Sequence, residues 1–144
     1  MEIRPANIND LDSIIIRLYE SELLRKANPV FIKTSIEMYP VFIALEGDEL
    51  VGFVYCRKFS PDILEPANIL VKKEFRSSGI GSRLLAEVER VSAGSYQSLI
   101  LVNSTLYKED SEKRDASNFY LKNGYVVILE TKGSTVFSKD LGSN

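Results

Sequence analysis

Apolar side chains recur at helical spacing over two stretches in the first third of the chain. In residues 7–27 the spacing of leucine and isoleucine predicts one helix, which Asn9 is expected to cap. Residues 28–40 predict a second, shorter helix that begins near Pro29 and ends before Pro40. Two helices are therefore expected close to the N-terminus.

β-Branched and aromatic runs surround these helical stretches. Residues 2–6 predict a short first strand. Residues 41–59 contain two such runs separated by Gly47-Asp48, a pair typical of a tight turn. The first half of the chain is therefore predicted to form a strand, two helices and a hairpin.

The second half of the chain switches several times between the spacing typical of helices and the apolar runs typical of strands. Its clearest helix carries an apolar stripe, and its clearest strand is a continuous apolar run that suits the centre of a sheet. The stripe consists of Ile80, Leu84, Leu85, Val88 and Val91. The predicted elements are a strand at 66–75, a helix from 80 to near 94, a strand at 98–103, a charged loop at 104–114, a short helix at 115–124 and a hairpin at 125–141 around Lys132-Gly133. Hairpins that flank a central β-α-β unit predict a mixed α/β fold.

The composition is that of one globular domain. With 144 residues the chain is expected to form a single domain spanning 1–144 and to bury roughly two-thirds of its unfolded surface. Hydrophobic residues make up 44% and charged residues 26%, which are ordinary values for such a domain. A net charge of −2 and a pI of about 5.3 argue against a binder of nucleic acid or of acidic membranes.

The cysteine and histidine counts exclude several kinds of chemistry. A single cysteine, Cys56, cannot form an intrachain disulfide, which favours a reducing, cytoplasmic setting. The absence of histidine excludes Ser-His-Asp and Cys-His catalysis and any zinc site built on histidine. Cys56 lies in an apolar strand and is interpreted as a core residue, and acidic pairs such as Glu109-Asp110 are interpreted as loop charge, so no metal site is expected. The first ten residues do not resemble a secretory signal, and no apolar run is long enough to span a bilayer.

A glycine-rich turn before the predicted helix is the clearest functional signal. The stretch Arg76-Ser-Ser-Gly79-Ile-Gly81 places two glycines where a helix begins. A helix start offers unpaired N–H groups and partial positive charge, and glycine lets that backbone approach an anion closely. No lysine follows Gly81 as in a Walker sequence, and Leu84 stands where the dinucleotide fingerprint has its third glycine. The turn therefore predicts a phosphate cradle of another kind.

This Arg-x-x-Gly-x-Gly turn, between a strand and an amphipathic helix, resembles the acetyl-coenzyme A site of the GNAT superfamily of N-acetyltransferases. The likeness extends over nearly the whole chain. Residues 3–14 look like the family's first strand and helix, residues 41–57 like its second hairpin, and residues 116–127 like its closing Ala-x-x-Phe/Leu-Tyr-x-x-x-Gly-Phe segment. The resemblance implies a GNAT-like fold, with a mixed, mostly antiparallel sheet of roughly six or seven strands flanked by about four helices.

The same resemblance implies which residues would hold acetyl-coenzyme A as a co-substrate. The pyrophosphate would rest on the backbone amides of the turn, and the pantetheine arm would add like a strand to the preceding strand through main-chain hydrogen bonds. Arg76 would support the turn and the phosphates, and Lys72 or Lys73 could meet the 3′-phosphate. The implied coenzyme-binding residues are Ile69, Leu70, Val71, Arg76, Ser77, Ser78, Gly79, Ile80, Gly81 and Ser82.

Acetyl transfer to an amine needs a proton acceptor, a proton donor and a group that stabilises the thioester oxyanion. A lysine-like amine, with a pKa of about 10.4, is mostly protonated at neutral pH, so a base must act. By resemblance, Tyr120 stands where the family places a tyrosine near the coenzyme sulfur, as the acid for the leaving thiolate. The alternative for Tyr120 is simple packing against the last helix. The amide of Leu70 or of Ile69 would stabilise the oxyanion.

Glu65 is the best candidate for the base. Strand alternation predicts that it shares a face with Ala67, Ile69 and Val71, and some family members have a glutamate at this place. A solvated loop glutamate is the alternative. Asp62, Glu37, Tyr39 and a chain of waters stay open as other bases.

Two departures from the family concern the pantetheine arm, and the acceptor stays open. Lys113, three residues before Ala116, stands where many members carry an asparagine that contacts pantetheine, and the charged loop between 103 and 116 is longer than usual. The acceptor is expected to be an amine of a small molecule or of a protein, and the acidic chain favours a cationic one. Assembly as a homodimer stays open. The rival interpretation is a non-catalytic sensor or complex subunit that binds acyl-coenzyme A.

Overall fold

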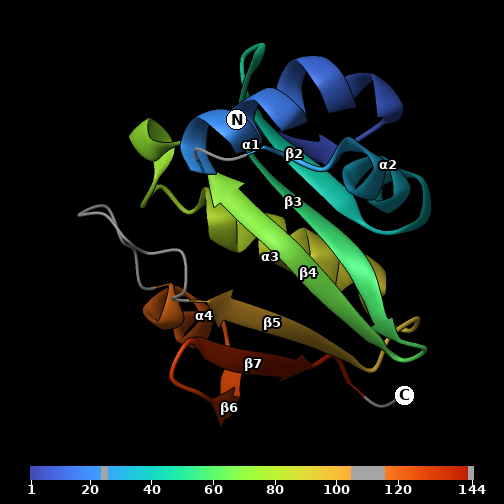
Figure 1. Cartoon of the computed structure of the whole chain (residues 1–144), viewed down its shortest axis with the longest axis vertical. Coiled ribbons are helices and arrows are strands. Elements are labelled where there is room, and N and C mark those ends of the chain that lie inside the picture. The colour runs from blue at the N-terminus through green and yellow to red at the C-terminus, as the bar shows by residue number, and fades with distance from the viewer. Residues whose placement is uncertain (24–25, 105–115, 143–144) are drawn as a thin grey trace.

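One seven-stranded sheet runs through the molecule (Figure 1). The computed structural model describes residues 1–23, 26–104 and 116–142. The strand order is β1-β2-β3-β4-β5-β7-β6, and every neighbouring pair is antiparallel except β4 and β5. The strands are β1 (Glu2–Pro5), β2 (Val41–Glu46), β3 (Glu49–Ser60), β4 (Ile63–Val71), β5 (Ser98–Ser104), β6 (Val126–Glu130) and β7 (Ser134–Asp140). The predicted mixed, mostly antiparallel sheet is confirmed.

Helices cover the two faces of the sheet (Figure 1). In the part of the chain that the structure describes, the α-helices are α1 (Arg17–Leu23), α2 (Pro29–Met38), α3 (Ile80–Ser92) and α4 (Ser117–Lys122). The first two pack on one face, and α3 and α4 contribute to the core on the other face. The fold is therefore a three-layer α/β sandwich with hydrophobic side chains on both sides of the sheet.

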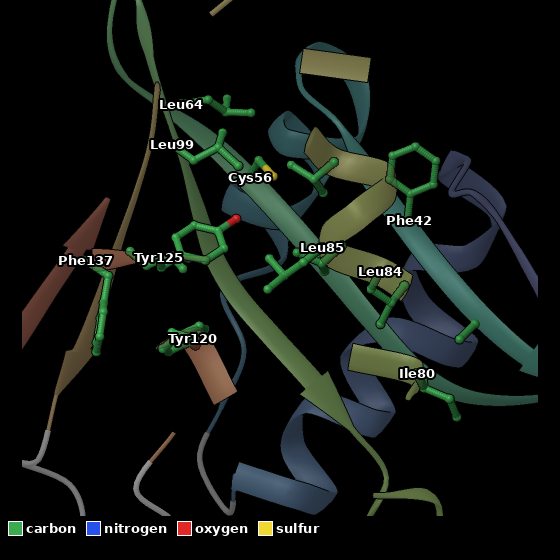
Figure 2. Close-up of a cluster of buried hydrophobic side chains, with 14 of the residues drawn as sticks. Phe42, Cys56, Leu64, Ile80, Leu84, Leu85, Leu99, Tyr120, Tyr125 and Phe137 are labelled. Atoms are coloured by element: carbon green, nitrogen blue, oxygen red, sulfur yellow. The ribbon is translucent and has the colours of Figure 1, made fainter. Parts of the chain in front are cut away.

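The core under α3 joins the two ends of the sheet. Leu84, Leu85 and Val88 of α3 are fully buried against side chains from β2 to β5 and β7. Figure 2 shows this cluster, with Tyr120, Tyr125 and Phe137 gathered on the side of the C-terminal strands. The predicted apolar stripe of α3 is confirmed at its first four positions. The prediction is wrong at Val91, which is 39% exposed, whereas Ser92, the next residue, is buried.

The start of the first helix differs from its prediction. A 3₁₀ turn at Ile8–Asp10 and a π-helical segment at Leu11–Ile16 come before α1. Asn7, and not Asn9, is the cap: its side chain accepts a hydrogen bond from the Asn9 N–H, and the Asp10 carboxylate accepts one from the Asn7 N–H at 2.8 Å. Both Asn7 and Asn9 are residue types that cap helices, so the sequence alone does not distinguish them. Asp10 favours Asn7, because its carboxylate lies three residues later and completes a capping box.

Most other predicted boundaries agree with the structure, and one strand is shifted. Both hairpins, the helix at 28–40 and the short helix at 115–124 are present at nearly the predicted places. The strand predicted at 66–75 is wrong at both ends, since β4 spans Ile63–Val71 and a 3₁₀ turn follows at Lys73–Phe75. Most of the predicted loop at 104–114, with Lys113, lies outside the described residues.

Candidate functional site

The sheet splits between β4 and β5. These parallel strands pair only at Ile63 with Ser98 and at Leu64 with Leu99. Beyond that point, in the described residues, β4 stays paired with β3 as far as Val71, and β5 stays paired with β7. Figure 1 shows the two strands diverging from this vertex. The edge of β4 that faces the split therefore has main-chain groups available to an extended ligand, as strand-addition sites do.

The turn after β4 leads this open edge to the start of α3. Ser77 and Gly79 adopt left-handed backbone conformations, with φ of 65° and 87°. Such a conformation is uncommon for serine, and strained backbone of this kind is typical of functional turns. The Ser78 hydroxyl donates to the Phe75 carbonyl and holds the turn closed. The turn thus reverses the chain tightly where the helix begins.

The N-terminus of α3 presents free backbone donors. Gly79 is its first flanking residue, and in the described residues no side chain caps it. The first α-helical bond runs from the Arg83 N–H to the Gly79 carbonyl at 3.1 Å. The N–H groups of Ile80, Gly81 and Ser82 therefore point out of the helix without a partner within it, at the positive end of a 13-residue helix. This arrangement suits an anion, and a diphosphate above all.

The two glycines of the turn have different surroundings. A Cβ added at Gly79 would meet nothing within 4 Å, so this backbone is open to a ligand. A Cβ at Gly81 would lie 3.0 Å from the ring of Phe119 on α4. Both glycines were expected to clear space for a ligand. At Gly81 the missing side chain instead makes room for the Phe119 ring.

Arg76 braces the turn. Its Nε donates to the Val71 carbonyl at 2.9 Å, and its Nη2 forms an ion pair of 3.0 Å with Glu22 of α1. The same Glu22 oxygen accepts the backbone N–H of Lys73 at 3.2 Å. The guanidinium thus fixes the end of β4 against α1, while the predicted contact between Arg76 and a phosphate stays a prediction.

Tyr120 lies in the core beside the split. Its ring centroid is 5.2 Å from that of Phe137 and 5.4 Å from that of Phe119. Burial raises the pKa of its phenol to about 12, so the hydroxyl keeps its proton at neutral pH. In the described residues no hydrogen-bond partner holds that hydroxyl. Tyr120 is therefore packed in the core, as its interpretation as a packing residue requires. It also carries a proton that it could donate.

A bulge in β4 interrupts its alternation. Tyr55 of β3 pairs with Asn68, whereas the next residue, Cys56, pairs with Pro66. Ala67 is therefore an extra residue in β4, which reverses the facing of every side chain beyond it. Sequence alternation cannot be continued through this point.

The prediction that Glu65 shares a face with Ile69 and Val71 is wrong for this reason. Ile69 and Val71 pack against the core under α3. Glu65 is directly across the strand pair from Arg57 and binds it through both carboxylate oxygens, at 2.8 Å to Nε and 3.4 Å to Nη2. The Arg57 guanidinium lies 5.3 Å from the ring centre of Phe31 on α2. Glu65 therefore faces the side of α1 and α2, and it is the first residue of β4 beyond the vertex.

The other candidate residues lie in β3 and at the two ends of β4. Lys72 pairs with Glu49 at 2.5 Å, and these contacts raise the pKa of its ammonium group. The Asp62 carboxylate accepts from the Ser60 hydroxyl in the turn between β3 and β4. Cys56 is fully buried, and burial raises the pKa of its thiol, as its interpretation as a core residue requires. Of the described residues, none forms a group of acidic, cysteine or histidine side chains able to hold a metal ion.

Sequence reasoning missed two residues of the site, Arg57 and Phe119. The partner of Arg57 depends on strand register, and the register depends on a bulge that has no clear sequence signal. Phe119 belongs to the closing segment that drew attention to Tyr120, yet its contact with Gly81 joins residues far apart in the chain. The proline at 66, next to the bulge, was the one available hint.

Comparisons with known proteins agree with this geometry. A model of the acetyltransferase (GNAT) domain matches residues 37–127, which include β4, the turn, α3 and Tyr120. No curated protein sequence matches the chain significantly. In the described residues no helix is long and apolar enough to cross a membrane.

Solved structures share the fold over nearly full length. The structure of Ard1 from Thermoplasma volcanium has a TM-score of 0.79 at 18% identity, covering 99% of this chain and 98% of that one. An aminoglycoside 6′-N-acetyltransferase complexed with coenzyme A has a TM-score of 0.78 at 17% identity, covering 100% and 99%. The putative acetyltransferase yncA from Salmonella typhimurium, solved with acetyl-CoA, has a TM-score of 0.79 at 15% identity, covering 100% and 95%. Because the family model spans more than half of the sequence, the chain belongs to the GNAT acetyltransferase family.

Proposed function

We propose that this protein transfers an acetyl group from acetyl-coenzyme A to a primary amine, by direct attack of the amine in a ternary complex. One observation carries the proposal: the open edge of β4 leads directly into the uncapped start of α3. A ligand that combines an extended amide-bearing arm with a diphosphate matches both features. Membership of the GNAT family supports the same ligand.

The residues present fit the coenzyme. Amides from Ser77 to Ser82 would hold the diphosphate, and the open backbone at Gly79 allows the close approach that this needs. Main-chain groups of Ile69, Leu70 and Val71 would hold the arm, because β4 makes no pair with β5 along this stretch. When bound, the coenzyme supplies a thioester-activated acetyl group.

Two groups of this chain would act at the thioester. Tyr120 keeps its proton at neutral pH and would donate it to the departing sulfur. The amide of Ile69 or of Leu70 would donate a hydrogen bond to the carbonyl oxygen. Ile69 packs against the core cluster that contains Tyr120, which supports a shared reacting space between the two halves of the sheet.

Glu65 stays the first candidate for the group that removes the amine proton. Its position next to the vertex supports this role, and its placement on the side of α2 gives the acceptor a separate approach from the coenzyme. Arg57 engages both of its oxygens, so the acceptor must compete for, or share, that carboxylate. Asp62, Glu37, Tyr39 and water stay the alternatives.

The pairing of Glu65 with Arg57 favours one second candidate function. A cradle that binds acyl-coenzyme A, next to a carboxylate already engaged, would serve a sensor or a subunit of a complex without catalysis. Coenzyme binding alone cannot separate the two functions, because both predict stabilisation by the coenzyme.

An assay of acetyl transfer separates them. Acetyl-coenzyme A is incubated with polyamines, amino acids, aminoglycosides and peptides, and thiol release is followed together with the mass of the acetylated product. The proposal expects amine-dependent thiol release with at least one acceptor. Glu65→Gln should lower the rate relative to the unaltered protein more at neutral pH than in alkali, where more of the amine is already neutral. Coenzyme binding by calorimetry without any transfer would overturn the enzyme and favour the sensor.

A further inference from the structure

The pair of Glu65 and Arg57 lies next to the vertex, on the side of α2. Glu65 is 7% exposed, which is unusual for a glutamate. It is the residue immediately after Leu64, where the pairing of β4 with β5 ends. A buried carboxylate at this place lies beside the space in which the reaction proposed above would occur.

Arg57 leaves part of its guanidinium free. Its Nε and Nη2 are bound to Glu65, and one face of the group lies over the Phe31 ring. A guanidinium has five N–H donors, and Nη1 has no partner in the described residues. The Arg57 side chain is 49% exposed, whereas the Glu65 side chain is 10% exposed. The pair thus presents a positive group with spare donors to solvent and a negative group toward the interior.

A structural role alone does not explain this arrangement. Burying a carboxylate has a desolvation cost, which the attraction of a half-exposed guanidinium offsets only in part. The neighbouring side chain on β3, Lys58, is exposed and makes no ion pair in the described residues, so the sheet does not require a charged pair at this level. A recognition role would explain why both charges are kept.

We propose that the acceptor is an amine that carries a carboxylate close to its amino group, such as a free amino acid. This inference rests on the proposed acetyl transfer. The ammonium group of the acceptor approaches Glu65. Its carboxylate receives one free N–H from Nη1 and the remaining N–H of Nη2 of Arg57, in the two-point manner that guanidinium favours. Phe31 forms the apolar wall next to this carboxylate site.

The same charges disfavour the cationic acceptors that the acidic composition suggested. A polyamine or an aminoglycoside would bring further positive charges next to the half-exposed guanidinium of Arg57. Like charges close together lower affinity and act as a device of specificity. The local charge at the site therefore outweighs the overall net charge of −2.

The test uses acceptors that differ only in one carboxylate. Three matched pairs are assayed with acetyl-coenzyme A: lysine with cadaverine, phenylalanine with phenethylamine, and leucine with isoamylamine. The expected ratio of kcat/KM, acid over amine, is roughly 10- to 100-fold for at least one pair. In Arg57→Met, which keeps the aliphatic stem, this ratio falls by about the same factor, mainly through KM of the acid.

Controls separate recognition from folding. Lys58→Met removes a cation from the next position of the same strand and should leave the ratio unchanged. Arg57→Lys keeps the charge but loses the planar fork, so an intermediate ratio is expected. If Arg57→Met lowers the rates for acid and amine equally, Arg57 has no part in recognition and the inference is wrong. If Arg57→Met fails to fold, Arg57→Lys decides: an unchanged ratio overturns two-point recognition by the guanidinium, and a lower ratio supports it.

The failure of this inference differs from the failure of the proposed function. Equal acetylation of acids and decarboxylated amines, or transfer to cadaverine alone, overturns the acceptor class and leaves the acetyltransferase standing. The absence of transfer to any amine overturns the proposed function. Calorimetry with each amino acid in the presence of coenzyme A then tests the carboxylate site at Arg57 on its own. Binding that Arg57→Met abolishes supports the carboxylate site, and absence of binding overturns it.

Discussion

The two parts of the sheet are covered differently. Strands β2 and β3, on the N-terminal side, have five and seven buried residues and carry hydrophobic clusters on both faces. Strand β6, at the far end of the C-terminal part, has every residue exposed, and Val102 of β5 is 49% exposed. The second cluster, on the side of α1 and α2, includes no residue of β5, β6 or β7.

This difference places the candidate site at the seam between the parts. β4 belongs to the doubly covered part and β5 to the singly covered part, and they pair at only two positions. The core under α3, which Tyr120, Tyr125 and Phe137 complete, also holds the two parts together. Because the ladder of hydrogen bonds is already interrupted here, an extended ligand could lie between the doubly covered and the singly covered part without breaking strand pairs.

The largest effect is expected from Tyr120→Phe. The change keeps the ring that packs against Phe137 and removes the proton that the C-terminal part would contribute. Loss of a general acid lowers turnover by roughly 10²–10⁴, with little change in coenzyme affinity. The measurement is kcat and the calorimetric Kd for coenzyme A in both proteins. Full turnover in this variant would reduce Tyr120 to a packing residue.

The next effect concerns the vertex. Leu99 of β5 is fully buried where the two parts meet, whereas Val102, on the same strand, lies on the uncovered face. Leu99→Ala should lower the free energy of unfolding by about 2–5 kcal/mol through the cavity that it leaves. Val102→Ala should cost less than about 1 kcal/mol, because its side chain is already half in water. Chemical denaturation measures both, and equal costs would contradict the difference in coverage.

Sequence reasoning was strongest where one local pattern sufficed. The periodic stripe of α3 and the glycines at Gly47-Asp48 and Lys132-Gly133 located the helix and both hairpins, since each signal lies within a few neighbouring residues. The glycine-rich turn and the start of α3 could be located for the same reason, because they are contiguous in the chain. Their binding of a diphosphate stays a prediction.

It was weakest where a fact depends on register or on distant contacts. The bulge at Ala67 inverts the facing of Glu65 relative to Ile69, and period-2 patterning gives no warning of it. The Arg57 partner and the contact between Phe119 and Gly81 arise only once strands and helices have packed. Val91 was misplaced because the buried position in the last turn of α3 is one residue later, at Ser92.

A smaller effect is expected where α4 of the C-terminal part contacts the cradle. Gly81→Val places a Cβ 3.0 Å from the Phe119 ring and should weaken coenzyme A binding by about tenfold or more. Two explanations are separable, since Phe119→Leu makes room for the new side chain. If the double variant recovers the affinity, Gly81 acts through packing. If it does not, the valine itself obstructs the diphosphate. Unchanged affinity in a folded Gly81→Val variant would contradict both.

The smallest effect is a loss of stability in alkali that originates in the C-terminal part. Burial raises the pKa of Tyr120 to about 12 and also raises that of Tyr125, whose hydroxyl donates to Glu89 at 2.8 Å. A tyrosine in the unfolded chain ionises at about pH 10, whereas these two stay neutral in the folded protein. Their stabilising contribution is therefore complete below about pH 10 and declines above it, by up to roughly 1.4 kcal/mol per pH unit for each tyrosine.

Tyr125→Phe tests this pH dependence. The variant loses one hydrogen bond at every pH, so its level of stability falls, but its slope above pH 10 should be shallower by the contribution of one proton. Urea unfolding at several pH values between about 8 and 11 measures the slope in both proteins. Parallel slopes would show that Tyr125 ionises in the folded protein as easily as in the unfolded chain, and that the core beneath the C-terminal strands admits water.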